Sequence, residues 1–307
     1  MRGAEEAAVL RGSLVPLVTP FRDGQIDQAA FDDLIEWQIA SGTHGLVIGG
    51  TTGEPTSLSL EEREFLIERA VRRARQRVPV IAGTGTNNLD ETLRLTAFAR
   101  RAGADAVLVV VPSFVRPSPE GLYRYFSAVA AATDLPVILY NIPGRTATNL
   151  DVETMARLAD AHRNIVGVKE ANKDFEHIIR VFHRLGSRLA VYSGIELFCF
   201  PLLALGGAGH VSATGNVIPR EVARLYDLAA AGRWEEAREL HTSLVPMNEA
   251  LFLETNPVPA KTALGLMGRI RPEVRPPLAP LAPASEARLR AVLEQYGLLA
   301  AAPVGGS

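Results

Sequence analysis

Apolar runs of five or six residues recur along the chain and divide it into units of similar length. There are eight of these runs, and none shows strict polar alternation: LVPLVT (14–19), GLVIG (45–49), VPVIAG (78–83), AVLVVV (106–111), PVILY (136–140), IVGVK (165–169), LAVYSG (189–194) and GHVSA (209–213). They start roughly 20 to 33 residues apart, about the length of one β–α unit. Such runs are typical of parallel strands that are buried on both faces.

The segments between the runs carry the spacing of amphipathic helices. In 27–41, four apolar residues recur at i, i+3, i+4 and i+8, counted from Phe31. Ser59 and Glu62 form a capping-box pattern at the start of a helix expected over 59–76. Strands that alternate with helices in this way predict an α/β fold, a closed (β/α)8 or TIM barrel, with a doubly wound sheet as the alternative.

The strand pattern stops after about residue 219. The segments that follow favour helices, namely 219–231, 233–252, 257–267 and 284–297. The stretch 269–283 is rich in proline and cannot form one regular element. We therefore expect two domains, a barrel over 1–218 that holds the active site and a C-terminal α-helical domain over 219–307, with a frayed end at AAPVGGS.

Composition and charge narrow the classes of function. Apolar residues make up 47% of the chain and charged residues 21%, a typical globular balance. A net charge of −2 gives no reason to expect a nucleic acid or an anionic membrane as a partner. No apolar run reaches transmembrane length, the start MRGAEEAAVLRG lacks the apolar core of a signal peptide, and Cys199 is the only cysteine. We expect a cytoplasmic protein.

Lysine is used sparingly in this chain. Of 32 lysines and arginines, only Lys169, Lys173 and Lys261 are lysines, and Lys169 ends an apolar strand in IVGVKEAN. A desolvated primary amine can lose its proton and attack a carbonyl, which arginine cannot do. The alternative is a structural ion pair with Glu170, but neighbouring side chains on a strand point to opposite faces. We therefore expect Lys169 to form a Schiff base at the barrel mouth.

Other candidate residues fall at the carboxyl ends of the predicted strands, where TIM barrels hold their active sites. The turn GGTTGEP (49–55) can present N–H groups and the hydroxyls of Thr51 and Thr52 to a carboxylate. Tyr140 ends the fifth strand and can relay a proton, and Arg145 in the next loop can bind a second carboxylate. Taken alone, the turn and Arg145 fit a structural role better, as a helix cap and a solvated arginine, and Tyr140 fits a packed position about equally well.

Other chemistries find little support. The six histidines and one cysteine show no metal-ligand spacing, and GTGTNN (83–88) lacks the third glycine of a dinucleotide-binding motif. There is no Walker sequence and no G-x-S-x-G serine elbow. We expect neither a metal nor a bound cofactor.

Four motifs together resemble the dihydrodipicolinate synthase / N-acetylneuraminate lyase family: GTTGEP, YNIPGRT, GVKEA and NPVPAK (256–261). The resemblance runs from LVPLVTPF (14–21) to YGLL (296–299). It implies a (β/α)8 barrel with a C-terminal helical domain, usually a homotetramer, that acts on a small 2-oxo acid and an aldehyde. It also implies a class I mechanism in which Lys169 condenses with pyruvate and Tyr140 moves protons.

The same resemblance assigns roles to further residues. Thr51 and Thr52 match the pair that binds the pyruvyl carboxylate, with Thr51 also in the proton relay. Arg145 matches the arginine that binds the carboxylate of the aldehyde in the synthase branch. The pocket-lining and aldehyde-end positions are matched by Gly194, Val211 and Glu196.

The arginine in PGRT favours the synthase branch, so the expected reaction joins pyruvate to aspartate-4-semialdehyde. One alternative is an aldolase or dehydratase of other 2-oxo acids, either 4-hydroxy-2-oxo acids or 2-oxo-3-deoxy sugar acids. A barrel that only binds a small oxo acid, and a scaffold with an inert site, are the alternatives without catalysis. An amine able to form an imine argues against both, because binding alone does not need one.

The chain departs from the family pattern at several positions. Phe114 replaces the tyrosine that enters the neighbouring subunit's site, and Ile195 replaces an acidic residue near the aldehyde end. The lysine-binding site of some synthases is matched only in part, at Asn87 and Glu91. Three positions of that site differ: Leu60, Arg63 and Ser113. We therefore expect no strong feedback inhibition by lysine.

Overall fold

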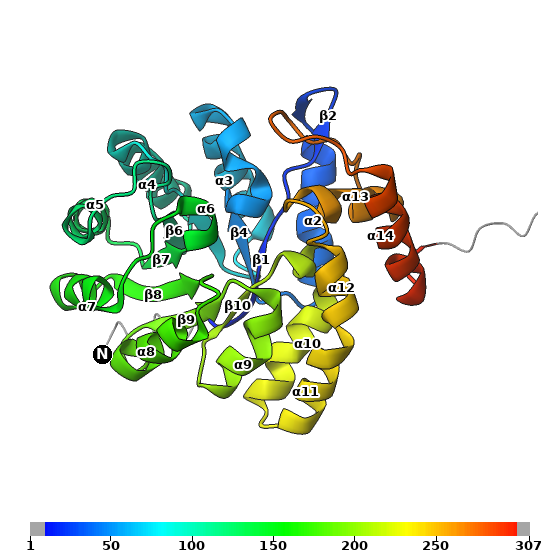
Figure 1. Ribbon diagram of the computed structural model, residues 1–307. Helices are drawn as coiled ribbons and strands as arrows, with labels where there is room; N and C mark the ends of the chain where they lie inside the picture. Colours follow the sequence, from blue (N-terminus) through cyan, green and yellow to red (C-terminus); the bar gives the residue numbers. More distant parts are fainter. Residues whose placement is uncertain (1–9, 300–307) are drawn as a thin grey trace, which may run out of the picture.

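Eight parallel strands close into a barrel in the computed structural model, which describes residues 10–299 (Figure 1). The strands are β1 (Gly12–Pro16), β4 (Gly45–Ile48), β5 (Val80–Gly83), β6 (Ala106–Val110), β7 (Val137–Asn141), β8 (Ile165–Glu170), β9 (Ala190–Ser193) and β10 (Gly209–Val211). Each strand pairs with the next along the chain, and β1 closes the barrel by pairing with both β4 and β10. The eight predicted strands and the closed (β/α)8 barrel are confirmed, and the doubly wound alternative is excluded.

Helices follow the strands and surround the barrel (Figure 1). They are α2 (Gln28–Ala40), α3 (Leu60–Ala74), α4 (Leu89–Ala102), α5 (Pro119–Ala131), α6 (Pro143–Thr146), α7 (Val152–Ala161), α8 (Phe175–Leu185), α9 (Cys199–Ala204) and α10 (Pro219–Ala230). Four single-turn 3-10 helices lie in the loops, namely η1 (Thr51–Gly53), η2 (Pro55–Ser57), η3 (Glu196–Phe198) and η4 (Ala213–Asn216). The predicted capping box is present at α3, where Ser59 Oγ accepts from Glu62 N and the Glu62 carboxylate accepts from Ser59 N.

The chain after the barrel is helical, as predicted. Its helices are α11 (Trp234–Ser243), α12 (Val245–Ala250), α13 (Val258–Leu266) and α14 (Pro283–Gln295). The helix expected over 233–252 is two helices, because Pro246 in the first turn of α12 has no N–H to donate back to the preceding turn. Residues 269–282 contain no helix or strand. AAPVGGS lies outside the described residues.

The predicted domain boundary at 218/219 stays a prediction, because the packing is continuous there. Helix α10 packs against β1 of the barrel and against α11. One hydrophobic cluster joins Val217 and Ile218 to Leu289 of α14. No helix within residues 10–299 is long and apolar enough to cross a membrane.

A two-stranded hairpin precedes α2 and was not predicted. It pairs β2 (Phe21–Arg22) with β3 (Gln25–Ile26) around Asp23 and Gly24, both of which have positive φ. Asp-Gly is a strong signal for this kind of tight turn. Strands of two residues are too short, however, to show any alternation of apolar and polar positions.

The apolar core has two layers. An outer cluster fills the space between the barrel and its helices, and an inner cluster fills the barrel. Tyr140 and Val211 belong to the inner cluster. The candidate site therefore begins where the packed interior of the barrel ends.

Candidate active site

A cavity of about 820 Å³ lies at the carboxyl ends of the strands. Its walls come from the segments that follow β4, β5, β6 and β7, and from the C-terminal helical part. Among the predicted site residues, Thr51 and Arg145 line it. Asn256, Pro257 and Arg275 close it from the C-terminal side.

The three residues predicted to be catalytic lie together. Tyr140 on β7 and Lys169 on β8 are paired in register, and Lys169 Nζ lies 4.0 Å from the centre of the Tyr140 ring. The Tyr140 hydroxyl is 3.3 Å from Thr51 Oγ1, at the start of η1. Lys169 and Tyr140 are each 4% exposed. The arrangement places an amine, a phenol and an alcohol in one continuous row at the barrel mouth.

Glu170 points away from Lys169, as the alternation of strand side chains predicts. Its buried carboxylate accepts hydrogen bonds from Asn141 Nδ2 at 3.0 Å and from Asn172 N at 3.0 Å, and lies 3.3 Å from His177 Nε2. Within residues 10–299, no carboxylate oxygen lies within 4.0 Å of Lys169 Nζ. The structural ion pair considered for Lys169 is therefore absent from this part of the chain.

Gly194 and Val211 both lie beside the row. A Cβ at Gly194 would stand 2.9 Å from Ala171 Cβ and 3.0 Å from Lys169 Cε. Any side chain there would push against the lysine, so glycine keeps space next to the amine. Val211 is buried in the same inner cluster as Tyr140.

Glu196 is buried, but its contacts lead to the loop after β10. Its Oε1 accepts from Ala213 N at 2.8 Å and from Ser212 Oγ at 3.3 Å. Burial raises the pKa of the Glu196 carboxyl, while the Ala213 N–H and the Lys169 charge oppose that rise. Its role in substrate binding stays a prediction. Like Lys169, Tyr140 and Thr52, Glu196 is buried and is not among the residues that line the cavity.

Phe114 turns its side chain to solvent. It is 91% exposed and has a φ of 70°, in the left-handed region that bulky residues rarely adopt. The side chain therefore does not line the cavity of its own chain. A contribution to a neighbouring subunit's site stays a prediction.

Asn256 and Lys261 hold the turn that carries the threonines. Neither residue was predicted to belong to the site. Asn256 Nδ2 donates to Thr52 Oγ1 at 3.0 Å, and the Asn256 carbonyl accepts from Arg145 Nη2 at 3.2 Å. Lys261 pairs with Glu54 at 2.6 Å. Both residues lie in NPVPAK, so the signal was present in a family motif. No local sequence pattern, however, indicates that they contact a turn so distant in the chain.

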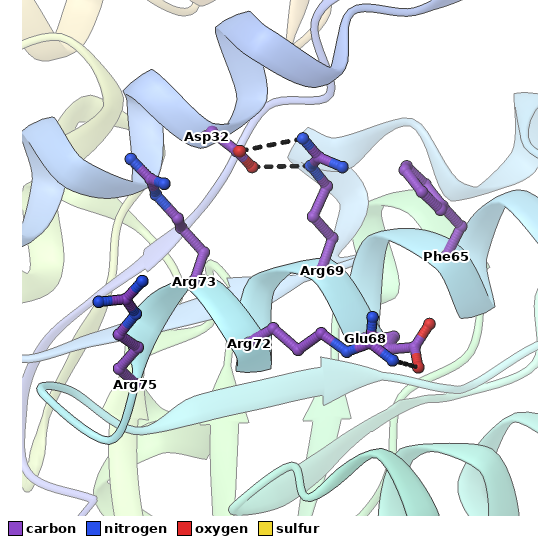
Figure 2. Close-up of a pocket in the computed structure, with 7 residues that line it drawn as sticks. All are labelled: Asp32, Phe65, Glu68, Arg69, Arg72, Arg73 and Arg75. Atoms are coloured by element: carbon purple, nitrogen blue, oxygen red, sulfur yellow. Dashed lines mark hydrogen bonds and ion pairs between the residues drawn. The ribbon is translucent and has the colours of Figure 1, made fainter.

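A second hollow of about 280 Å³ lies on the outer surface between α2 and α3 (Figure 2). Arg69 donates two hydrogen bonds to Asp32, at 2.7 and 2.9 Å, and Arg72 donates to Glu68 at 2.5 Å. Figure 2 shows the two sides of the Arg69–Asp32 pair facing one another across the gap. None of the predicted site residues lines this hollow, so the cavity at the barrel mouth is the candidate active site.

The sequence matches the model of the Dihydrodipicolinate synthetase family over residues 9–296. The chain belongs to this family. It is 48% identical over 292 residues to the 4-hydroxy-tetrahydrodipicolinate synthase of Syntrophobacter fumaroxidans, covering 95% of this chain and 100% of that one. It is 47% identical over 292 residues to an enzyme of the same name from Thermus thermophilus, covering 95% and 98%.

The fold agrees with the sequence. The crystal structure of dihydrodipicolinate synthase from Aquifex aeolicus matches with a TM-score of 0.93 at 43% identity, covering 95% of this chain and 100% of that one. The family membership expected from the four motifs is thereby confirmed.

Proposed function

We propose that this protein condenses pyruvate with aspartate-4-semialdehyde through a Schiff base on Lys169. It is a lyase of the dihydrodipicolinate synthase family, like the relatives named 4-hydroxy-tetrahydrodipicolinate synthase. The observation that carries the proposal is the row formed by Lys169, Tyr140 and Thr51. At one end of the row, the Lys169 amine has no carboxylate oxygen within 4.0 Å in residues 10–299.

The row supplies what imine chemistry needs. The Lys169 amine attacks the carbonyl carbon of pyruvate, and loss of water gives an iminium ion. The iminium withdraws electrons, so C3 loses a proton and the resulting enamine attacks the aldehyde carbon. The amino group of the second substrate then attacks the imine carbon and displaces the Lys169 amine, which closes the ring and frees the lysine. Tyr140 accepts and returns the protons, and the Thr51 hydroxyl at 3.3 Å is the next group to which a proton can pass. This mechanism requires no metal and no bound cofactor.

The charged ends of the two substrates find separate partners. The η1 turn supports the pyruvate carboxylate through the hydroxyls of Thr51 and Thr52. The guanidinium of Arg145 lines the cavity and is suited to the carboxylate of the second substrate. A carboxylated aldehyde therefore fits the cavity better than an uncharged one.

We further propose that the chain works as a homotetramer in the cytoplasm. Two exposed apolar surfaces support subunit contacts. One is formed by Phe114 and Val115, which are 91% and 64% exposed. The other combines Phe175 and Ile179 of α8 with Leu197 of η3, and the ring of Phe175 contacts that of Phe198.

Reduction with borohydride in the presence of pyruvate tests the Schiff base. Intact-mass measurement followed by peptide mapping should find one reduced pyruvyl adduct, on Lys169. The variant Lys169→Arg should give none, and Lys173→Arg should keep the adduct because Lys173 is exposed and outside the row. An adduct confined to Lys173 or Lys261, or no adduct, would contradict the proposal.

Steady-state assays then test the second substrate. We expect turnover of pyruvate with aspartate-4-semialdehyde. Cleavage of a 2-oxo-3-deoxy sugar acid with a higher kcat/KM would instead support the aldolase alternative.

A further inference from the structure

Asn256 contacts both Thr52 and Arg145, the residues proposed to bind the two substrate carboxylates, from outside the barrel. It lies in the C-terminal helical part, is 8% exposed and lines the cavity. Its side chain contacts Thr52, and its backbone carbonyl contacts Arg145. The two contacts use different atoms of one residue, so they can be separated by substitution.

The contact with Thr52 sets the direction of a hydroxyl hydrogen. A threonine hydroxyl has one hydrogen to donate, and it can accept at the same time. Asn256 Nδ2 donates to Thr52 Oγ1 at 3.0 Å, so the hydrogen of Thr52 is left for another acceptor. Thr51, the neighbour of Thr52, lines the cavity. In the proposed function the pyruvate carboxylate bound at this turn is such an acceptor, and hydrogen bonds to a charged group are the stronger kind.

The Asn256 amide presents its donor, Nδ2, to Thr52, and its acceptor, Oδ1, points away from that hydroxyl. Within residues 10–299, Asn256 Oδ1 is buried and has no hydrogen-bond partner. Rotating the amide would let Oδ1 accept from the Thr52 hydroxyl, but that would consume the hydrogen that a carboxylate needs. The direction of the amide therefore decides whether the Thr52 hydroxyl donates to a carboxylate or to Asn256.

A buried ion pair anchors the segment that carries Asn256. Lys261, in the second turn of α13, pairs with Glu54 at 2.6 Å. Glu54 ends the η1 turn and has a φ of 56°. Asn256 and Lys261 therefore contact two residues of the same turn, Thr52 and Glu54. The two contacts together hold this turn against the segment 256–261.

We propose that Asn256 is a positioning residue for pyruvate: its amide keeps the Thr52 hydroxyl directed at the pyruvate carboxylate, while its backbone carbonyl holds Arg145. The proposal rests on the proposed function. It assigns part of the active site to the C-terminal helical part of the chain.

Borohydride trapping of the full-length protein over a series of pyruvate concentrations measures the effect without the second substrate. Asn256→Ala should raise the half-saturating pyruvate concentration about tenfold, because the Thr52 hydroxyl is no longer held toward the charged carboxylate. The KM for aspartate-4-semialdehyde should change less than about twofold, because the backbone carbonyl that holds Arg145 remains. Asn256→Asp keeps the side-chain shape but accepts instead of donating, so its half-saturation should rise further.

A double-mutant cycle separates positioning from a structural role. In a Thr52→Val background, Asn256→Ala should have no further effect on half-saturation, because the hydroxyl it directs is gone. Asn248→Ala is the matched control. Asn248 is also a buried asparagine of the C-terminal helices, and it accepts a hydrogen bond from Thr214 of the barrel at 2.8 Å, outside the cavity lining. It should lower the Tm and leave half-saturation unchanged.

Three results would overturn the positioning role. These are an unchanged half-saturation in Asn256→Ala and Asn256→Asp, full additivity with Thr52→Val, or an equal rise in Asn248→Ala. Failure of the proposed function would give a different result, because the wild-type protein would then form no pyruvate adduct on Lys169. That result would also contradict the positioning role.

Discussion

Two buried lysines show how the partner, and not burial alone, decides what a lysine does. Lys169 and Lys261 both lie over an aromatic ring, at 4.0 Å from Tyr140 and 4.2 Å from Phe21. Lys261 is also 2.6 Å from Glu54, whereas Lys169 has no carboxylate within 4.0 Å in residues 10–299. Burial lowers the pKa of Lys261, and Glu54 opposes that shift. The amine of Lys261 is engaged by the Glu54 carboxylate, whereas the amine of Lys169 is the one that we propose attacks a carbonyl.

Exchanging the amine of Lys169 should have the largest effect. Lys169→Arg keeps a positive charge but cannot form an imine, so kcat should fall by at least about a thousandfold. The Tm should change little, because no ion pair is broken. Assays with pyruvate and aspartate-4-semialdehyde measure the first effect and thermal unfolding the second. A large loss of Tm with residual activity would reverse the assignment of the two lysines.

Removing the amine of Lys261 should act on stability. Lys261→Met leaves the buried Glu54 without its cation and should lower the free energy of unfolding by about 3–5 kcal/mol. The double variant Glu54→Gln with Lys261→Met should lose less than the sum of the single variants, because no unpaired charge remains. Urea unfolding measures both. A loss under about 1 kcal/mol in Lys261→Met would show that the pair is not an anchor.

His210 is another buried basic residue, and within residues 10–299 no carboxylate oxygen lies within 4.0 Å of its ring nitrogens. Burial lowers the pKa of His210 to about 4 from its ordinary value of 6.5, and His44 and His241 act in the same direction. The unfolded chain therefore binds a proton that the folded chain does not, between about pH 6.5 and pH 4. The free energy of unfolding should fall by about 3 kcal/mol as the pH drops through that window.

The His210→Gln variant isolates this contribution. It lacks the titrating group, so the difference between wild type and variant should depend on pH, while the contributions of other groups cancel. Urea unfolding at several pH values measures that difference. A constant difference from pH 7 to pH 4 would mean that His210 does not titrate in this way.

Tyr140 tests the other end of the row. Tyr140→Phe keeps the ring over Lys169 but removes the hydroxyl next to Thr51. We expect kcat to fall about a hundredfold, because proton transfer loses its positioned group. The pyruvate adduct should still form under borohydride, more slowly than in the wild type. An unchanged kcat would place the proton relay elsewhere.

The smallest effect expected is that of free lysine. The sequence matches the family's lysine-binding residues only in part, and Arg63 fills the space next to Gly83, donating to its carbonyl at 2.8 Å. Burial lowers the pKa of Arg63 to about 10, so this cation stays charged near neutral pH. Millimolar lysine should therefore leave the initial rate almost unchanged. Half-inhibition at sub-millimolar lysine would contradict this expectation.

Local patterns were sufficient for the barrel, because each of its strands is a separate apolar run. Capping at Ser59 and the turn glycine at Gly103 were also predictable, since a cap depends on residues within a few positions. The Asp23–Gly24 hairpin and the break before α12 were missed. The strands of the hairpin are too short to show alternation of apolar and polar positions, and the break before α12 was missed because Pro246 was not weighed as a helix breaker.

The fold, the family and the candidate nucleophile all follow from patterns in the amino-acid sequence. Strand ends meet at one rim of any parallel barrel, so Lys169 and Tyr140 could be placed together before any coordinates. The groups that hold the threonine turn at this rim became evident only from the three-dimensional structure. Asn256 and Lys261 reach Thr52 and Glu54 from more than 200 positions along the chain. Contacts over that distance depend on how the C-terminal helices dock, and helix docking has no local sequence signal.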